Sequence, residues 1–273
     1  MSILKETFTL SNGVKIPKLG FGTWQISDFD TAYASVTDAL ELGYRHIDTA
    51  FVYGNEKAVG KAVRDSGIPR EEIFVTSKLP AEIKDAARAR EHYKMTTDNL
   101  DIGTLDLYLI HAPWPWEEMG KDCTQGNIEV WGVMEEIYKS GVSRAIGVSN
   151  FSPTDLQAVI DNGTIVPMVN QIRLFAGNPQ MENCEYCDKH NILVEAYSPF
   201  ATGKLLGNSE LDKIAEKYDV SLTQLCLKYV LERGILPLPK STHREYIKLN
   251  TELDNFTISD EDMAYLNSLK FDI

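Results

Sequence analysis

The chain has 273 residues, 43% of them hydrophobic and 10% aromatic, which is enough to build the core of one large α/β domain. A formal net charge of −13 disfavours sequence-independent binding to nucleic acid or to an anionic membrane. Four cysteines, Cys123, Cys184, Cys187 and Cys226, are few for this length and favour a reducing, cytoplasmic location.

The amino-terminal segment predicts a hairpin. Its first residues, MSILKETFTL, lack the charged region and apolar core of a signal peptide, and no apolar stretch in the chain approaches the roughly 20 residues that span a bilayer. The following stretch, TFTLSNGVKIP, has two short alternating runs around Asn12 and Gly13. Asn-Gly favours a two-residue turn, because both positions then adopt positive φ.

Strand-like and helix-like segments then alternate to the end of the chain. The strand-like runs are residues 18–23, 44–49, 73–78, 105–111, 144–149, 168–172, 192–198 and 235–241. Strict alternation predicts a parallel sheet, and about eight units favour closure into a (β/α)8 TIM barrel. We therefore expect one domain over residues 1–273, with the hairpin capping the bottom of the barrel, and a monomer, because a barrel buries its own core.

Several helices carry capping signals. Ser152 with Asp155 and Ser221 with Gln224 have the spacing of capping boxes, and Asn178 before Pro179 predicts a further N-cap. The helical pattern FDTAYASVTDALELG ends at a glycine. The main structural alternative is an open Rossmann sheet, which requires G-x-G-x-x-G after its first strand. The first turn here reads GFGTWQIS and lacks the third glycine.

Four polar residues lie at or just after the ends of three consecutive strand-like runs. Asp48 is near the end of the second run and Tyr53 follows it, Lys78 ends the third run and His111 ends the fourth. A parallel barrel gathers such residues into one pocket. A phenol titrates near 10, and a nearby ammonium lowers that pKa, while a carboxylate offsets the cost of burying the ammonium. Tyr53 is thus predicted as a general acid, tuned by Lys78 with Asp48, and His111 as a group that orients a carbonyl oxygen or relays a proton.

The motifs around these residues together resemble the aldo-keto reductases. They are GYRHIDTAFVYGNEKAVGKAV, IFVTSKL, LDLYLIHAP, AIGVSNF, VNQI, EAYSPF and PLPKS, and they extend over nearly the whole chain. The likeness is greatest to the short bacterial, prostaglandin F synthase-like and diketogluconate reductase-like members. The resemblance implies an NAD(P)H-dependent carbonyl reductase with an aldehyde or ketone substrate, and it gives the same roles to Asp48, Tyr53, Lys78 and His111.

The resemblance also implies a cofactor site. The positions of Ser149, Asn150 and Gln171 match residues that hold the nicotinamide carboxamide, Tyr197 matches the residue that stacks on the ring, and Thr23 matches another contact. Ser198 begins a loop, SPFATGKLL, that suits the pyrophosphate. The tail KSTHREYIKLN would reach the far end of NADPH through Lys240, Ser241, Thr242, Arg244 and Asn250, with the free N–H groups of a helix start favouring phosphate.

The chain departs from the family pattern at the cofactor tail. Two positions that are usually arginine carry His243 and Tyr246, neither of which offers the forked cation that clamps a 2′-phosphate. We therefore expect NADPH to bind but NADH to be rejected less strongly than in relatives with both arginines. At the exit of the sixth barrel strand, Arg173 and Phe175 replace the usual acidic residue and histidine.

Aromatic residues predict the substrate pocket. Trp24, Phe51, Trp114 and Trp116 follow strand-like runs, and the last two are placed to compensate for Ala112, where the family has tryptophan. No metal site is expected, because Cys184, Cys187 and His190 share one helix without a fourth ligand nearby.

Two other classes of function remain as alternatives. A non-catalytic cofactor sensor or regulatory subunit would use the same fold, but it would not need the four polar residues. A phosphate-binding barrel isomerase or hydrolase would need a phosphate cradle after strands 7 and 8 and a carboxylate base at a strand end.

Overall fold

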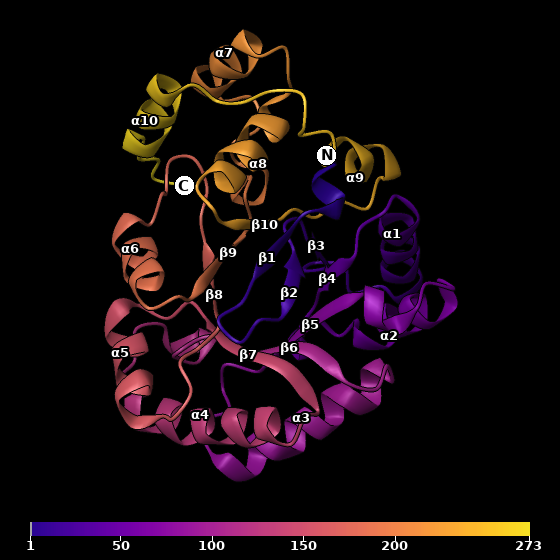
Figure 1. Cartoon of the computed structure of the whole chain (residues 1–273), viewed down its shortest axis with the longest axis vertical. Coiled ribbons are helices and arrows are strands. Elements are labelled where there is room, and N and C mark those ends of the chain that lie inside the picture. The colour runs from indigo at the N-terminus through magenta and orange to yellow at the C-terminus, as the bar shows by residue number, and fades with distance from the viewer. Residues whose placement is uncertain (1) are drawn as a thin grey trace.

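A computed structural model describes residues 2–273. Eight parallel strands form the wall of a barrel, with each strand bonded to its neighbours in chain order (Figure 1). The strands are β3 (Phe21–Gly22), β4 (His46–Asp48), β5 (Phe74–Leu79), β6 (Leu105–Ile110), β7 (Ser143–Ser149), β8 (Val169–Arg173), β9 (Leu193–Tyr197) and β10 (Leu236–Leu238). Each overlaps one predicted run, so the predicted (β/α)8 barrel is confirmed.

Backbone hydrogen bonds between the first and last strands close the barrel. The N–H groups of Gly20 and Gly22 donate to the carbonyl oxygens of Pro237 and Pro239, at 3.2 and 2.9 Å. A Cβ on Gly20 would lie 2.4 Å from a methyl of Leu238 and 2.7 Å from Nδ1 of His46. Glycine at position 20 therefore permits the close approach of the two strands.

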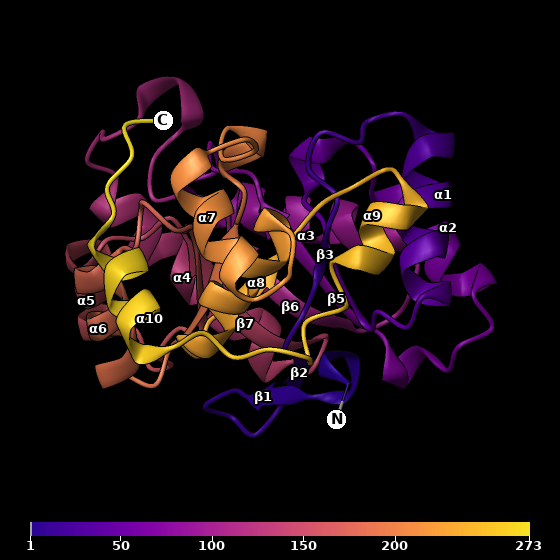
Figure 2. The same cartoon turned by 90° about the horizontal axis from the view of Figure 1, so that it is seen from above.

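Ten α-helices surround this wall among the described residues (Figures 1 and 2). They are α1 (Phe29–Glu41), α2 (Glu56–Asp65), α3 (Ala86–Leu100), α4 (Thr124–Lys139), α5 (Pro153–Asn162), α6 (Met181–Lys189), α7 (Ser209–Lys217), α8 (Leu222–Glu232), α9 (Arg244–Leu249) and α10 (Asp260–Ser268). The connection between β9 and β10 contains two helices, and α9 and α10 follow the last strand. Apolar side chains of the strands and of the inner helix faces form the main core, and Ile26, Ala32 and Ala58 form a small separate cluster.

The predicted hairpin is present, but its turn is longer than expected. Strands β1 (Thr7–Thr9) and β2 (Lys15–Pro17) pair antiparallel, and Leu10 N–H donates to the Val14 carbonyl across residues 11–13. Only Gly13 of this turn has positive φ, at 87°, which is typical of a three-residue hairpin loop and corrects the two-residue prediction. The Asn12 side chain donates to the Arg144 carbonyl at the amino-terminal end of β7, so the hairpin covers the bottom of the barrel (Figure 2).

Both predicted capping boxes form, but one predicted cap is wrong. Ser152 with Asp155 begins α5, and Ser221 with Gln224 begins α8. Helix α6 begins after Gln180, whose φ is 50° and whose side chain makes no capping bond. Asn178 does not cap it, because its backbone N–H donates to the Phe175 carbonyl at 2.8 Å and its side chain donates to the Arg173 carbonyl.

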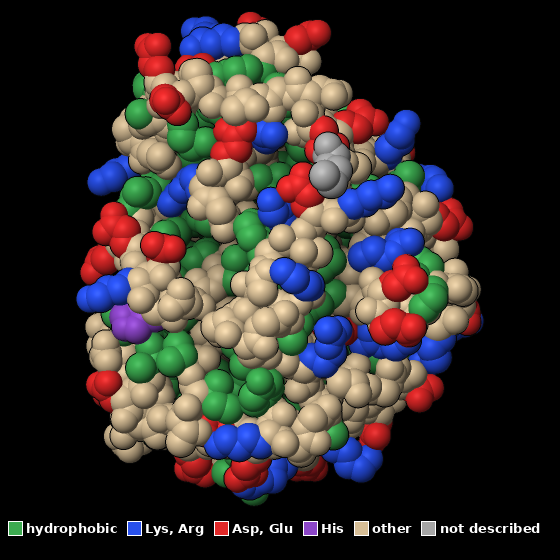
Figure 3. Space-filling view, viewed as in Figure 1, with side chains coloured by type: hydrophobic (Ala, Val, Ile, Leu, Met, Phe, Trp, Pro, Cys, Tyr) green, Lys and Arg blue, Asp and Glu red, His purple; other side chains and the backbone are tan. Residues whose placement is uncertain are grey.

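Charges on the hairpin face are mixed. Lysine and arginine side chains alternate there with acidic ones, and neither sign forms a large single patch (Figure 3). In the described part of the chain, none of the helices has the length and apolar character needed to cross a bilayer.

Candidate active site

A cavity of about 860 Å³ opens at the carboxyl end of the barrel. Its wall includes residues at or just after the carboxyl ends of most of the strands, which is where barrel enzymes place their active sites. Eleven of the predicted site residues line it: Trp24, Asp48, Tyr53, His111, Trp116, Ser149, Asn150, Gln171, Tyr197, Ser198 and Lys240.

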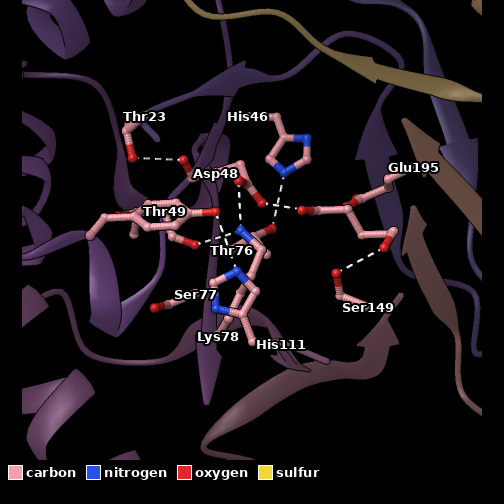
Figure 4. A network of polar contacts seen from close by, with 12 residues as sticks. Thr23, His46, Asp48, Thr49, Thr76, Ser77, Lys78, His111, Ser149 and Glu195 are labelled. Atoms are coloured by element: carbon pink, nitrogen blue, oxygen red, sulfur yellow. Dashed lines mark hydrogen bonds and ion pairs between the residues drawn. The ribbon is translucent and has the colours of Figure 1, made fainter. Parts of the chain in front are cut away.

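A buried ion pair lies beneath the cavity. Lys78 is fully buried, and its Nζ donates to Asp48 Oδ1 at 2.7 Å and to the Thr49 carbonyl at 2.8 Å (Figure 4). Asp48 ends β4 and Lys78 lies near the end of β5, so adjacent parallel strands bring the pair together. A buried ammonium needs such a partner, and this pair therefore fixes the position of the Lys78 charge.

Tyr53 and His111 lie above this pair. Tyr53 ends a short 3₁₀ helix, Phe51–Tyr53, and its ring lies 5.1 Å from Lys78 Nζ, measured to the ring centroid. Its hydroxyl is 3.5 Å from His111 Nε2, and the two rings meet edge to face. The four predicted polar residues thus share one site, with the phenol hydroxyl and the imidazole on the cavity wall.

The surroundings of Tyr53 and His111 keep both side chains neutral at pH 7. Burial, followed by the charge of Lys78, lowers the pKa of His111 well below its usual value. Burial, followed by the charge of Asp48, raises the pKa of Tyr53 well above 10. This corrects the expectation that Lys78 lowers the pKa of Tyr53: desolvation is the larger effect, and Asp48 opposes the field of the ammonium.

Hydrogen-bonded polar side chains at the ends of β7, β8 and β9 form another part of the cavity wall. The Tyr197 hydroxyl donates to Asn150 Oδ1 at 2.9 Å, and Asn150 Nδ2 donates to the His111 carbonyl at 3.0 Å. Ser149 Oγ donates to the backbone carbonyl of Gln171 at 2.8 Å. These bonds orient an aromatic ring and several amide and hydroxyl groups toward one side of the cavity.

Backbone strain is concentrated at this cavity. Four residues of its wall that are not glycine have positive φ: Gln25 at 64°, Asn150 at 61°, Ser198 at 50° and Thr202 at 58°. Positive φ is unfavourable for a β-branched residue such as Thr202. Strained residues of this kind cluster at ligand sites, where the surrounding structure holds them in place.

A further acidic residue, Glu195, contacts the site and was not predicted from the sequence. Gln171 Nε2 donates to Asp48 Oδ2 and to Glu195 Oε2, both at 2.8 Å. Glu195 lies on β9 and is fully buried. A carboxylate inside the apolar run ILVEAYS was the available signal.

The remaining predicted cofactor residues do not line the cavity. Thr23 is fully buried, with its hydroxyl donating to the Asp48 carbonyl at 3.0 Å, and Asn250 is buried at the end of α9. Ser241 Oγ accepts from the His243 N–H, and Thr242 is exposed beside it. Arg244 forms ion pairs with Asp38 and Glu41 of α1.

Two of the four predicted pocket aromatics do not line the cavity. Trp24 and Trp116 are on its wall, and Trp116 packs edge-on against His111. Phe51 instead packs against His92 of α3, and Trp114 lies against Trp116. Val52 and Leu206 contribute exposed apolar surface to the wall in their place.

The cysteines of α6 contact other protein groups, with Arg233 Nη2 at 3.6 Å from Cys184 Sγ and Asn170 Nδ2 at 3.7 Å from Cys187 Sγ. Cys187 is buried with its Sγ 3.5 Å from Asn183 Oδ1, and His190 stacks on Tyr186. Among residues 2–273, no group of three or more histidine, cysteine, aspartate or glutamate side chains could hold a metal ion.

Comparisons with known proteins agree with this geometry. A sequence model described as "Aldo/keto reductase family" matches residues 18–270. Glyoxal reductase of Bacillus subtilis is 38% identical, with 98% of this chain and 94% of that protein covered. The 9,11-endoperoxide prostaglandin H2 reductase of Trypanosoma cruzi is 36% identical, with 97% and 91% covered.

Solved structures show the same fold. An aldo/keto reductase from Brucella melitensis superposes with a TM-score of 0.90 at 38% identity, covering 97% of this chain and 99% of that one. A Bombyx mori aldo-keto reductase in complex with NADP superposes with a TM-score of 0.87 at 32% identity, covering 96% and 92%. On these grounds the protein is an oxidoreductase and belongs to the aldo/keto reductase family.

Proposed function

We propose that this enzyme reduces an aldehyde or ketone with hydride from NADPH or NADH, and that Tyr53 donates the proton. The supporting observation is the position of the Tyr53 hydroxyl, which lines the cavity 3.5 Å from His111 Nε2 while its ring lies over Lys78. A carbonyl oxygen held between Tyr53 and His111 would be within reach of an acid.

The donor and acceptor groups of the cavity suit a nicotinamide. Tyr197 offers a flat ring, and Ser149, Asn150 and Gln171 offer groups for a carboxamide. Two carboxyl groups engage the Gln171 amide nitrogen, so its carbonyl oxygen is the atom left to accept a hydrogen bond from a ligand. A reduced nicotinamide bound there would supply the hydride.

The protein side chains then handle the proton. As hydride adds to the carbonyl carbon, the C=O π pair moves to oxygen, and the developing alkoxide takes the Tyr53 proton. The raised pKa of Tyr53 keeps that proton in place until then. The Lys78 ammonium offsets the negative charge left on the phenol oxygen. His111, neutral because its pKa is lowered, fits the role of hydrogen-bond donor better than that of proton relay.

For the cofactor, we infer that NADPH binds and that NADH is also accepted. Lys240 on the cavity wall, with Ser241 and Thr242, would contact the 2′-phosphate. Arg244 is already paired with two acidic side chains of α1, which weakens its contribution. This leaves Lys240 as the principal cation for that phosphate.

For the substrate, we infer a small carbonyl compound with an apolar or aromatic portion. The wall around the proposed acid exposes Trp24, Val52, Trp116 and Leu206. Curated relatives are named as reductases of glyoxal, of aldehydes and of a prostaglandin endoperoxide. We further propose that the enzyme acts as a monomeric, single-domain barrel over residues 1–273 in the cytoplasm.

Replacing Tyr53 by Phe tests the proposal. Reduction of a panel of aldehydes and ketones should fall by about 10² to 10⁴ in kcat, the usual range for a general acid. NADPH binding should be retained, because the proposed cofactor contacts are unchanged. Quenching of the fluorescence of Trp24 and Trp116 measures this binding. Tyr265→Phe, at an exposed tyrosine of α10, is the control and should keep full activity.

Two outcomes would contradict the proposal. Full activity of Tyr53→Phe would remove the tyrosine acid. Tight NADPH binding by the unmodified protein, without turnover of any carbonyl compound in the panel, would instead favour the sensor function.

A further inference from the structure

Glu195 is a fully buried carboxyl group with a single hydrogen-bond partner in the described part of the chain. It lies on β9 opposite Gln171 of β8 and accepts from Gln171 Nε2 at 2.8 Å. Its other oxygen, Oε1, has no partner among the described residues. Burying a carboxyl group that lacks an ion-pair partner and has one unbonded oxygen costs folding free energy. We therefore expect its role to lie in the adjacent site.

The partner of Glu195 joins two acidic groups. Gln171 Nε2 also donates to Asp48 Oδ2 at 2.8 Å, and Asp48 in turn accepts from Lys78. Asp48 Oδ2 and Glu195 Oε2 both accept from this nitrogen, and a neutral Glu195 can still accept through Oε2 when its proton is on Oε1, so the amide nitrogen faces the two carboxyl groups. The side-chain oxygen Oε1 of Gln171, a residue of the cavity wall, is then the end of the amide that is left to bond a ligand.

We propose that Glu195 is a positioning residue, which holds the Gln171 amide in the orientation that presents its carbonyl oxygen to the cofactor carboxamide. The inference rests on the proposed function, because it assumes that a nicotinamide occupies this cavity. With only Asp48 as acceptor, the second amide hydrogen would be unsatisfied, and the side chain could rotate away.

Glu195 also lies in the fields of the ion pair below the cavity. The flanking strands place Gln171 and Leu236 beside it, neither of which titrates, and the charged groups whose fields act on it are Asp48 of β4 and Lys78 of β5. Burial, followed by the charge of Asp48, raises the pKa of Glu195 to about 8. The side chain is therefore mainly neutral at pH 7 and gains its charge above pH 8.

Ionisation of Glu195 should weaken the proton donor. The negative charge of Asp48 already raises the pKa of Tyr53, and a second buried charge, bonded to the same Gln171 amide nitrogen as Asp48, would act in the same direction. A phenol of still higher pKa gives up its proton less readily. Reduction should therefore slow as the pH rises through about 8, in addition to any intrinsic proton dependence of the reaction.

Two variants separate these effects. Glu195→Gln keeps an oxygen that accepts from Gln171, so NADPH should bind within about twofold of the unmodified enzyme at pH 7, and the alkaline fall of kcat/KM should move to higher pH. Glu195→Leu removes the acceptor, and the dissociation constant for NADPH should rise by about 3- to 10-fold, the size expected for one hydrogen bond.

Glu56→Gln is the matched control. Glu56 is another buried carboxyl group of raised pKa, bonded to Ser77 at 2.6 Å and Asn99 at 2.9 Å, and it does not line the cavity. This variant should change neither NADPH affinity nor the pH profile.

The results can overturn this inference without affecting the proposed function. Unchanged NADPH affinity in a folded Glu195→Leu variant would refute the positioning role. If Glu195→Leu does not fold, an unchanged pH profile of Glu195→Gln refutes the role of the charge, and a more than tenfold loss of NADPH affinity in Glu195→Gln refutes the account of the amide. Activity in Tyr53→Phe, by contrast, would remove the proposed function itself.

Discussion

Removing the Lys78 ammonium should destabilise the protein as well as inactivate it. A Lys78→Met variant leaves the Asp48 carboxylate buried, at 4% exposure, with the Gln171 amide as its only side-chain donor within residues 2–273. Breaking a buried ion pair by deleting one partner costs about 3–5 kcal/mol. For a chain of this size, that corresponds to a fall in Tm on the order of 5–10 °C. We also expect kcat to fall by about 10² or more, because the phenolate loses its nearest cation.

Neutralising both partners should separate stability from catalysis. In Lys78→Met/Asp48→Asn no unpaired charge is buried, and replacing a buried pair by neutral groups is often close to neutral in stability. The double variant should therefore recover most of the free energy of unfolding lost by Lys78→Met, while its kcat remains low. Urea denaturation and steady-state kinetics at saturating cofactor measure the two quantities on the same samples.

Two results would refute this reasoning. A loss below about 1 kcal/mol in Lys78→Met would mean that water reaches Asp48 and that the pair is not buried in solution. Recovery of activity in the double variant would mean that the charge of Lys78 does not support the acid.

The remaining predictions concern the cofactor, pH and packing. His243→Arg/Tyr246→Arg should raise NADPH affinity by tenfold or more and leave NADH nearly unchanged, as compared by kcat/KM; an unmodified enzyme that already rejects NADH many thousandfold would contradict it. Between pH 4.5 and about 8 the unfolded chain ionises Glu195 while the native state keeps it protonated, so stability falls as pH rises. Glu195→Gln should remove this fall, on the order of 4 kcal/mol, in urea denaturation at pH 5 and 8, and an equal fall in both proteins would refute it. Gly60→Ala should cost about 1–3 kcal/mol in thermal unfolding, because its Cβ would lie 1.9 Å from a backbone oxygen at the end of α3, whereas Gly132→Ala, with no atom within 4 Å, should be neutral or stabilising.

Local sequence patterns determined the elements of this protein. Strand-like apolar runs located all eight barrel strands, and the spacing of Ser152 with Asp155 located a helix start, because pattern and capping depend on neighbours in the chain. The same runs placed Asp48, Lys78 and His111 at strand ends, and parallel closure then brings strand ends together whatever the loops do. The predicted two-residue turn at Asn12 was wrong, because the length of the loop also depends on which residues of the two strands pair.

Only the tertiary structure decided what each charged group faces. No sequence motif marks Glu195 as a site residue, and its contact with Gln171 forms only when β8 and β9 lie side by side. Arg244 is held by α1, roughly 200 residues earlier, and Phe51 turns toward α3 rather than into the cavity. The sign of the Tyr53 pKa shift also depended on burial and on Asp48, because desolvation and electric fields act through space and are not encoded in sequence spacing.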